Sequence, residues 1–427
     1  MISLAPDDER VLSGVEGEGP AFFSIFEVDV KVDMVSLKMD HHINKTIKTV
    51  GSDRGYVDAF IVMDVMERAR AAEAAGRRII HMEVGQPATP APAGAIAALR
   101  QALDQPLGYT VALGLPALRA GIAGLYQRWY GVTMDPERVI VTTGSSAAFL
   151  LAFTALFDAG DRVALGEPGY PSYRQILRAL SLTPVAVPSR MEARLQPTPE
   201  DLAGVEAKGL IVASPGNPTG TMLDRAALAG LMGWAEARGA AFISDEIYHG
   251  LHYGERAVSA LEISQDAWVI NSFSKYFSMT GWRIGWMVVP EAQVRRVERL
   301  AQNMFICPPH ASQLVALAAL DCEEELEANR AVYATNRQLM LDGLPRAGIS
   351  RFAPPDGAFY VYANVSHLTE DSLALAGEIL DKAGVAVTPG IDFDPIRGRQ
   401  MLRFSYARST EDIVEGLARL QAFMAAR

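Results

Sequence analysis

The 427-residue sequence contains only two cysteines, Cys307 and Cys322, and no Cys-X-X-Cys pair or cysteine–histidine cluster. This scarcity excludes a disulfide-stapled scaffold and a thiolate zinc site, and it is typical of proteins from a reducing compartment. Because no other ligand cluster stands out along the chain, we expect the protein to hold no metal.

Long hydrophobic runs and an excess of positive charge are also missing. The longest mainly apolar run, Ala147 to Phe157, covers 11 residues, whereas a membrane-spanning helix needs about 20. The formal net charge of −11 argues against general binding to nucleic acid or anionic membranes. Met1 to Arg10 carry three acids and one base, so they lack the positive start of a secretory signal. We therefore expect a soluble, cytoplasmic protein with no nucleic-acid or membrane partner.

What is present is ordinary for a globular enzyme: 49% hydrophobic and 21% charged residues, in a chain long enough for two or three domains. Residues 1–50 differ, with nine acids, five bases and no helical period. We predict an N-terminal extension over residues 1–55 that packs loosely or stays mobile. A start assigned too early is the alternative, since Met34, Met39 and Met63 lie downstream.

From Ile61 onward, apolar periodicity predicts alternating helices and strands. Helices are expected from Ile61 to Gly76, from Ser146 to Phe157, and from Asp224, placed to cap, to Gly239, placed to stop. Short apolar runs predict strands, at residues 79–84, 139–142, 162–165, 210–213, 241–244, 268–271 and 284–289. Such alternation indicates an α/β protein with a mostly parallel central sheet and helices on both faces.

The pattern changes after about Ser312. A long helical stretch is followed by expected strands at residues 358–365 and 401–406, and by a closing helix from Thr410. We interpret this part as a second, smaller α+β domain. No internal repeat or low-complexity tract appears.

Polar residues follow several of the expected strands, where open α/β sheets place their ligand sites. Ser145 and Ser146 open a helix after a glycine, a pattern that suits an anion. Asn217 sits in a loop with two prolines and two glycines, and Asp245 ends an apolar strand. Each of these has a plain structural explanation as a helix cap, a turn or an ion-paired carboxylate.

The segment from Ser272 to Trp286 is the most informative, because it places Lys275 among aromatic and hydroxyl side chains with Arg283 nearby. A lysine desolvated in this way becomes nucleophilic and can form a Schiff base. For any single lysine, a solvated surface position is the more frequent explanation.

Taken together, these residues resemble the class I/II aminotransferases, fold type I pyridoxal-phosphate enzymes related to aspartate aminotransferase. The resemblance extends from about Val57 to the C-terminus. Its motifs occur in the order of the family, and they are Gly85-Gln-Pro87, Tyr109 with Gly114 and Leu118-Arg119, Gly144, Pro168-Gly-Tyr-Pro171, Asn217-Pro-Thr-Gly220, Asp245-Glu-Ile-Tyr248, Ser272-Phe-Ser-Lys275, Gly281-Trp-Arg283 and Arg403.

The resemblance implies a role for each matching residue toward pyridoxal 5′-phosphate. Lys275 would carry the cofactor covalently and act as the general base, while Asp245 would pair with the pyridine nitrogen. Tyr248 and Asn217 would hydrogen-bond the ring hydroxyl, and Tyr170 would stack on the ring. The phosphate would be bound by the following residues: Ser145, Ser146, Ser272, Arg283, and Tyr109 from a partner subunit.

The resemblance also implies the substrate side of the site. Arg403 would bind the substrate α-carboxylate, with Gly85 and Asn217 close by. The expected reaction moves an amino group from an L-amino acid to a 2-oxo acid in ping-pong fashion, in a homodimer with shared active sites. The resemblance also implies three domain regions. An arm and part of the small domain would occupy residues 56–96, a large cofactor-binding domain residues 97–320, and the rest of the small domain residues 321–427.

The sequence departs from the family at residues 300–307, which contain no Arg or Lys. Aspartate-specific members supply an arginine there for the distal carboxylate of the substrate, so aspartate specificity by this route is in doubt. Two other functions remain open. A C–S β-lyase or other elimination or decarboxylation enzyme would share the cofactor residues. A regulatory domain would need a basic N-terminal DNA-binding segment, which residues 1–50 do not provide.

Overall fold

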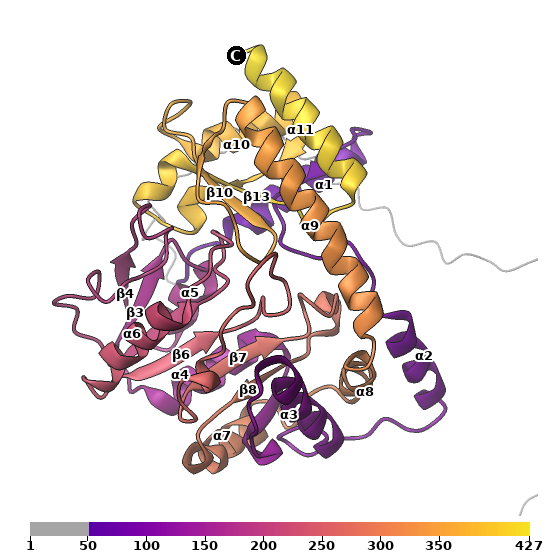
Figure 1. Ribbon diagram of the computed structural model, residues 1–427, viewed down its shortest axis with the longest axis vertical. Coiled ribbons are helices and arrows are strands. Elements are labelled where there is room, and N and C mark those ends of the chain that lie inside the picture. Colours follow the sequence, from indigo (N-terminus) through magenta and orange to yellow (C-terminus); the bar gives the residue numbers. More distant parts are fainter. Residues whose placement is uncertain (1–50) are drawn as a thin grey trace, which may run out of the picture. The chain divides into compact units, whose positions relative to one another are not determined.

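The computed structural model describes residues 51–427, so the prediction of a mobile extension over residues 1–55 lies almost wholly outside the described residues. Its main feature is a seven-stranded sheet in the order β2-β8-β7-β6-β5-β3-β4 (Figure 1). The strands are β2 (Val139–Thr142), β3 (Arg162–Glu167), β4 (Thr183–Pro188), β5 (Gly209–Ala213), β6 (Ala241–Asp245), β7 (Trp268–Ser272) and β8 (Gly285–Val288). Only β8 runs antiparallel to its neighbours, so the expected mostly parallel sheet is confirmed.

Both faces of this sheet are covered by helices, and alternate strand residues feed two separate apolar clusters. Val139 and Val141 belong to one cluster, while Ile140 between them belongs to the other. This alternation follows from the two-residue period of a strand. The covering helices are α3 (Pro116–Tyr130), α4 (Gly144–Leu156), α5 (Pro171–Ala179), α6 (Arg225–Glu236), α7 (Glu291–Met304) and α8 (His310–Ala319).

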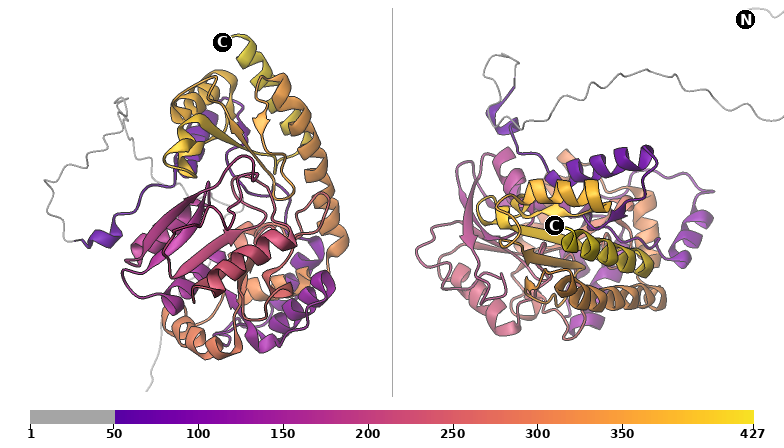
Figure 2. Two further views of the ribbon diagram at one scale, coloured as in Figure 1. Left: turned by 60° about the vertical axis from the view of Figure 1, so that its left-hand side comes forward. Right: turned by 90° about the horizontal axis from the view of Figure 1, so that it is seen from above.

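A smaller α+β part packs above the large sheet, as Figure 2 shows. It contains a four-stranded antiparallel sheet in the order β12-β13-β10-β9 and a two-stranded parallel sheet of β1 and β11. These strands are β1 (Ile80–His81), β9 (Arg351–Phe352), β10 (Tyr360–Asn364), β11 (Val385–Ala386), β12 (Thr388–Pro389) and β13 (Met401–Ser405). Its helices are α1 (Ile61–Ala74), α10 (Ser372–Ala383), α11 (Thr410–Ala425) and part of α9 (Glu323–Arg346), while α2 (Ala93–Ala102) packs against α8 of the large part (Figure 1).

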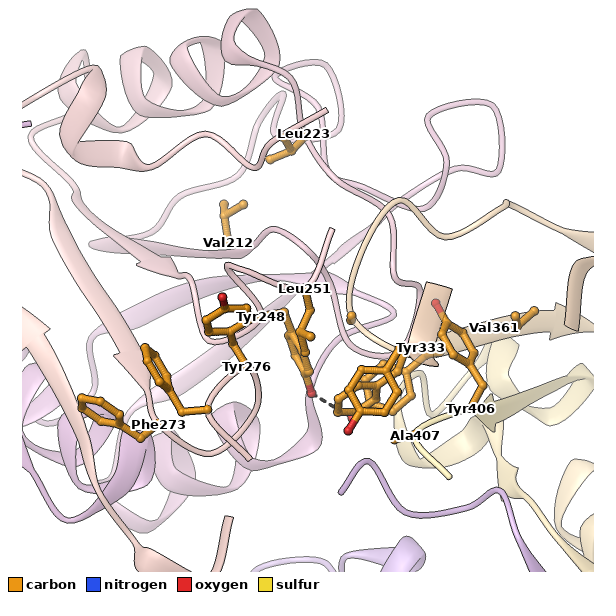
Figure 3. Close-up of a cluster of buried hydrophobic side chains, with 14 of the residues drawn as sticks. Val212, Leu223, Tyr248, Leu251, Phe273, Tyr276, Tyr333, Val361, Tyr406 and Ala407 are labelled. Atoms are coloured by element: carbon orange, nitrogen blue, oxygen red, sulfur yellow. Dashed lines mark hydrogen bonds between the residues drawn. The ribbon is translucent and has the colours of Figure 1, made fainter. Parts of the chain in front are cut away.

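The 24-residue helix α9 extends from the neighbourhood of α8 to α11 and so runs alongside both parts (Figure 1). The aromatic core is continuous in the same direction. Figure 3 shows one buried cluster that extends from Phe273 past Leu251 to Tyr333 of α9 and Tyr406. The segments that follow the strands of the large sheet therefore share one apolar core with the smaller part.

Several local predictions match the structure. The Asp224 carboxylate caps α6 by accepting a hydrogen bond from the Ala227 backbone N–H at 2.8 Å. The strand expected at residues 79–84 is shorter than predicted, because β11, its only partner strand within residues 51–427, offers two residues for pairing. The domain bounds at residues 96 and 320 stay predictions; α2 spans the first and α9 begins just after the second.

Within residues 51–427, no helix has both the length and the apolar character that a membrane span requires. In the same range, no three His, Cys, Asp or Glu side chains are grouped so that they could hold a metal ion.

Candidate active site

A cavity of about 220 Å³ lies beyond the carboxyl ends of the parallel strands β5, β6 and β7, and residues of the smaller part close its other side. Ten of the predicted site residues line it: Arg403, and the nine residues Gly85, Ser145, Ser146, Tyr170, Asn217, Asp245, Tyr248, Lys275 and Arg283. Arg403 lines it from β13. Residues spread over more than 300 positions of the chain thus meet in one place, as the motifs predicted.

Lys275 follows β7 and points its ammonium group into this cavity. Its Nζ donates a hydrogen bond to the carbonyl of Gly85 at 2.6 Å. Burial, followed by the charges of Arg403 and Arg283, lowers the pKa of the Lys275 ammonium to about 8, against the opposing charge of Asp245. A lysine with this pKa carries a substantial neutral fraction near physiological pH, as a nucleophile or base requires.

Asp245 ends β6 and is almost fully buried, with 4% of its surface exposed. One carboxylate oxygen accepts the Ile247 backbone N–H at 3.0 Å, and the other accepts the hydroxyl of Tyr173. Burial raises the pKa of Asp245 to about 6. Among the described residues, no Lys, Arg or His forms an ion pair with Asp245, so its charge is available to a cationic group of a ligand.

Another part of the cavity wall, at the start of α4, has the features of an anion-binding site, which we call the anion cradle. Ser145 and Ser146 form the first turn of α4, which begins at Gly144. Gly144 has a φ of +73°, and a Cβ at this position would lie 2.5 Å from Nη2 of Arg283. The glycine therefore lets the guanidinium approach the helix N-terminus, where backbone N–H groups, hydroxyls and a fixed cation suit a phosphate group.

Two predicted phosphate residues lie elsewhere in this chain. Ser272 is buried behind the cavity wall, with its hydroxyl oxygen 3.0 Å from the Ile284 carbonyl and 2.9 Å from the Ser274 hydroxyl. Ser274, which the motif did not single out, lines the cavity instead. Tyr109 is 84% exposed and does not line the cavity of its own chain, so its contact with a partner's phosphate stays a prediction.

Arg403 is held at the smaller part's side of the cavity by several contacts. Its Nη1 donates to Oδ1 of Asn217 at 2.9 Å, and its Nη2 donates to the Glu83 carbonyl and to the Thr388 hydroxyl. The Nε hydrogen is buried without a partner among the described residues. A fixed guanidinium with a spare buried donor fits a carboxylate ligand.

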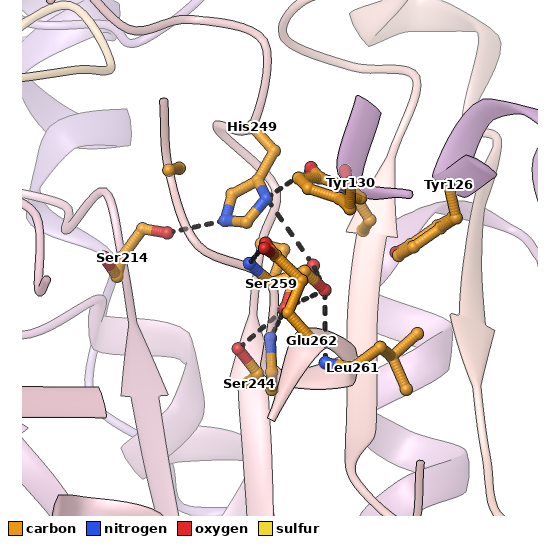
Figure 4. Close-up of polar contacts among 12 residues, drawn as sticks. Tyr126, Tyr130, Ser214, Ser244, His249, Ser259, Leu261 and Glu262 are labelled. Atoms are coloured by element: carbon orange, nitrogen blue, oxygen red, sulfur yellow. Dashed lines mark hydrogen bonds and ion pairs between the residues drawn. The ribbon is translucent and has the colours of Figure 1, made fainter. Parts of the chain in front are cut away.

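The loop that carries Asn217 is supported from behind by the buried polar network in Figure 4. The Nε2 of His249 lies 2.9 Å from the Ser214 carbonyl, and its Nδ1 lies 2.6 Å from the Tyr130 hydroxyl. Burial lowers the pKa of His249 to about 3, so the ring is neutral and can donate at one nitrogen and accept at the other.

Phe60, Met63, Tyr173, Ser274 and Tyr360 are among the lining residues that sequence reasoning missed. Tyr173 lies three positions after Tyr170, and this helical spacing could have placed it on the same face of α5. Phe60 and Met63 reach the cavity only because Asp392 accepts hydrogen bonds from the backbone N–H groups of Ile61 and Val62 and so fixes the start of α1. Nothing in the local sequence signals that contact.

Comparison with known proteins agrees with this geometry. The family profile described as aminotransferase class I and II matches residues 77–420, and the chain belongs to this family. It is 48% identical to the valine–pyruvate aminotransferase of Mycobacterium tuberculosis over 87% of this chain and 97% of that protein.

Solved structures show the same fold. One from Silicibacter pomeroyi is 68% identical, with a TM-score of 0.85, and the match covers 88% of this chain and all of that chain. Aspartate aminotransferase from Thermus thermophilus with maleate is 30% identical, with a TM-score of 0.82, over 87% of this chain and 98% of that chain. The fold type I prediction is confirmed.

The function prediction is also confirmed at the level of reaction class. The protein is an aminotransferase, which moves an amino group between an amino acid and a 2-oxo acid. The comparisons thus support this reaction, the first of the functions that the motifs left open.

Proposed function

We propose that this aminotransferase uses pyridoxal 5′-phosphate and takes an apolar aliphatic amino acid, such as valine, as its amino donor. The observation that carries the cofactor proposal is the match of three separate groups to three parts of that molecule. The anion cradle at α4 suits the phosphate, Asp245 suits a protonated ring nitrogen, and Lys275 suits the aldehyde carbon. This cofactor supplies an aldehyde that condenses with amines and a ring that withdraws electrons from the substrate α-carbon.

Residues of this chain then bind the substrate, transfer the proton and hold the binding groups in place. Arg403 binds the α-carboxylate of the amino acid through its spare donor and fixes the orientation of the α-carbon. The neutral Nζ of Lys275 takes the proton from that carbon and later returns a proton, because its lowered pKa permits both directions. Asn217 holds Arg403 in place from the large sheet's side.

The donor proposal rests on what lines the rest of the cavity. Its described lining contains three Lys or Arg side chains, and each has a place: Lys275 and Arg283 toward the cofactor, Arg403 toward the α-carboxylate. Phe60, Val62 and Met63 supply an apolar wall. The described lining offers no counter-charge to a distal carboxylate, whereas burial of an aliphatic side chain against this wall is favourable. The relative that acts as a valine–pyruvate aminotransferase points the same way.

We further propose a homodimer in a cytoplasmic location. Exposed apolar side chains gather on the loop before α3 and around the end of α7, and a 3.4 Å contact between the Thr110 N–H and the Cys307 sulfur joins these two segments. The set comprises Leu107, Tyr109, Val111, Met304 and Ile306, each at least 40% exposed. A second copy would cover this patch and bring Tyr109 to the partner's phosphate.

Two experiments test these proposals. Borohydride reduction of the cofactor-loaded enzyme, followed by peptide mapping, should find the pyridoxyl group on Lys275, and a label on another lysine contradicts the assignment. Single amino acids are then added to the loaded enzyme without any 2-oxo acid. Valine should remove the visible cofactor band faster than aspartate does, and the reverse order would exclude an apolar donor.

A further inference from the structure

Tyr360, the first residue of β10, contacts both halves of the cavity although no motif marks it. It is 1% exposed and lines the cavity wall. Its hydroxyl oxygen lies 2.8 Å from that of Tyr248, and the two rings meet edge to face with centroids 5.7 Å apart. Tyr360 therefore joins a strand of the smaller part to the turn that follows β6.

The ring of Tyr360 makes a second contact, to Arg403. The guanidinium carbon lies 4.5 Å from the centroid of the Tyr360 ring and 4.7 Å from that of Phe393. Buried cations are attracted to aromatic faces, and a planar guanidinium that rests on a ring keeps its N–H groups directed along its edge. The ring thus fixes the plane in which Arg403 presents donors to a carboxylate.

The backbone beside Tyr360 leaves room for its hydroxyl. A Cβ at Gly85 would collide with that hydroxyl, so no residue other than glycine fits there without displacing it. The carbonyl of the same Gly85 accepts the hydrogen bond from Lys275. The Tyr360 hydroxyl is therefore packed directly beside the backbone that holds the lysine.

The two hydroxyls share one hydrogen bond, which uses one of their two protons. If Tyr360 donates, the proton of Tyr248 stays free to point into the cavity; if Tyr248 donates, that proton is consumed. We infer that Tyr360 is a positioning residue with two separable functions. Its hydroxyl donates to Tyr248 and so directs the Tyr248 proton toward the ring oxygen of the cofactor, and its ring holds Arg403 flat for the substrate carboxylate. The inference rests on the proposed cofactor.

Tyr360→Phe removes the hydroxyl and keeps the ring. Tyr248 then donates less effectively to the ring oxygen, because hydrogen bonds in a chain strengthen one another. More negative charge stays on that oxygen and holds the neighbouring proton on the Lys275 nitrogen more tightly. We expect the apparent pKa of the visible cofactor band to rise by about 0.5, since one neutral hydrogen bond is involved. The KM for the amino donor should change less than about twofold, because the ring contact persists.

Tyr360→Leu removes the ring as well. We expect the same spectral shift together with a rise of about tenfold in the KM for the amino donor, the size of a buried cation–ring contact. If the Tyr360→Leu variant does not fold, the measurement is repeated on Tyr360→Met, whose side chain is similar in volume to leucine and also lacks the ring. Tyr362→Phe is the matched control, because Tyr362 lies on the same face of β10 and its hydroxyl donates to Gly390 at 3.3 Å. It should leave both the spectral pKa and KM unchanged.

The outcomes separate the claims. An unchanged spectral pKa in Tyr360→Phe overturns the function of the hydroxyl. Equal increases in KM for the phenylalanine and leucine variants overturn the function of the ring. Before any variant is made, the wild-type enzyme is mixed with pyridoxal phosphate. If it shows neither a visible band nor a borohydride-stable link at Lys275, the cofactor proposal itself has failed and this inference falls with it.

Discussion

At the scale of single residues, the Asp245 carboxylate illustrates how neighbours set the chemistry of a functional group. Burial raises its pKa, while the hydroxyl of Tyr173 and the N–H of Ile247 lower it again, so that the pKa lies at about 6. Tyr173 is itself buried against Tyr170 and Phe149 and cannot turn to another partner. Its hydrogen bond therefore keeps Asp245 ionised near neutral pH.

Tyr173→Phe should lower kcat about tenfold at pH 7, since a hydrogen bond to a charged group is worth about 1.5–3 kcal/mol. The pKa of Asp245 should rise when this donor is lost, so the acid limb of the kcat–pH profile should move to higher pH. Kinetics between pH 5 and 9 measure both effects. Tyr126→Phe, at a buried tyrosine bound to Trp286, is the control. An unchanged pH profile would show that Tyr173 does not act on Asp245.

The residues that could be predicted from the sequence are those whose surroundings are local. Asp245 ends a strand, and Asn217 and Lys275 lie in the loops that follow strands, so a strand prediction and a motif place them together. Tyr360 and Phe60 come from elements that meet the site only after the smaller part has folded onto the large sheet. No residue spacing along the chain indicates that these elements come together.

At the scale of elements, the turn after β6, which carries Tyr248, also contains a buried carboxyl group, that of Glu246. The carboxyl group accepts hydrogen bonds from the hydroxyls of Ser244 and Ser259 and from the Ala260 backbone N–H. Burial raises the pKa of Glu246 from 4.5 to about 8 in spite of these donors. The folded protein thus favours the protonated form of Glu246.

This raised pKa predicts a loss of stability with rising pH. Between pH 4.5 and about 8 the folded state binds the proton more tightly than the unfolded state, so the stabilisation is complete below pH 4.5 and is lost as pH rises through 8. Glu246→Gln cannot titrate. The unfolding free energy of the wild type, relative to this variant, should therefore fall from pH 5 to pH 9, by at most about 1.4 kcal/mol per pH unit.

Urea unfolding of the cofactor-loaded protein at pH 5, 7 and 9 measures this difference. Glu236→Gln, at an exposed position at the end of α6, is the control and should show no pH-dependent difference. A constant difference between wild type and Glu246→Gln would mean that Glu246 is ionised in the fold throughout.

Helix α1 is the element that closes the cavity with apolar side chains. Met63 lies in its first turn, lines the cavity and is 53% exposed, so a longer polar side chain can be accommodated there. Met63→Arg adds the cation that the cavity lacks for a distal carboxylate. We expect kcat/KM for aspartate relative to valine to rise at least about tenfold, as one charge-assisted hydrogen bond permits.

Met63→Gln has a similar length without the charge and should leave the ratio close to that of the wild type. If both variants change the ratio equally, or if neither does, α1 does not face the donor side chain.

Element prediction succeeded where strands are buried on both faces, as in β2, β5 and β7. It missed β4, which lies at the sheet edge and carries Pro184 and Pro188, residues that usually argue against a strand. The two-residue strands β9, β11 and β12 are too short to show a period of two. Their pairing depends on their partner strands, β10, β1 and β13, rather than on their own sequences.

At the scale of the whole molecule, the exposed patch around Tyr109 and Ile306 predicts a shared active site. In mixtures of Tyr109→Phe and Lys275→Ala chains, each heterodimer would combine one doubly altered site with one intact site. Near-normal cofactor affinity should then return at one of the two sites of each heterodimer, because Tyr109→Phe alone costs about 1.5–3 kcal/mol of that affinity. Cofactor titration of the mixture measures this recovery.

If the mixture shows only the weak affinity of the Tyr109→Phe parent, the tyrosine serves its own chain. Sedimentation of the wild type provides an independent control, since a protein that stays monomeric at assay concentration cannot share its sites. A permanent dimer of this kind buries roughly 2,000–5,000 Å².

The parallel pair of β1 and β11 has a consequence for how the chain folds as it is made. Ile80 pairs with Val385, and the nearby Thr388 hydroxyl donates to the Glu83 carbonyl across 305 positions. The ribosome synthesises β1 early, but its partner emerges only after the entire large sheet has been translated. The large sheet can therefore fold first as a unit, while β1 waits without a partner. Arg403, on β13, is translated after every strand of the large sheet, so the strand ends that carry Asp245 and Lys275 can form before the guanidinium proposed for substrate binding has been synthesised.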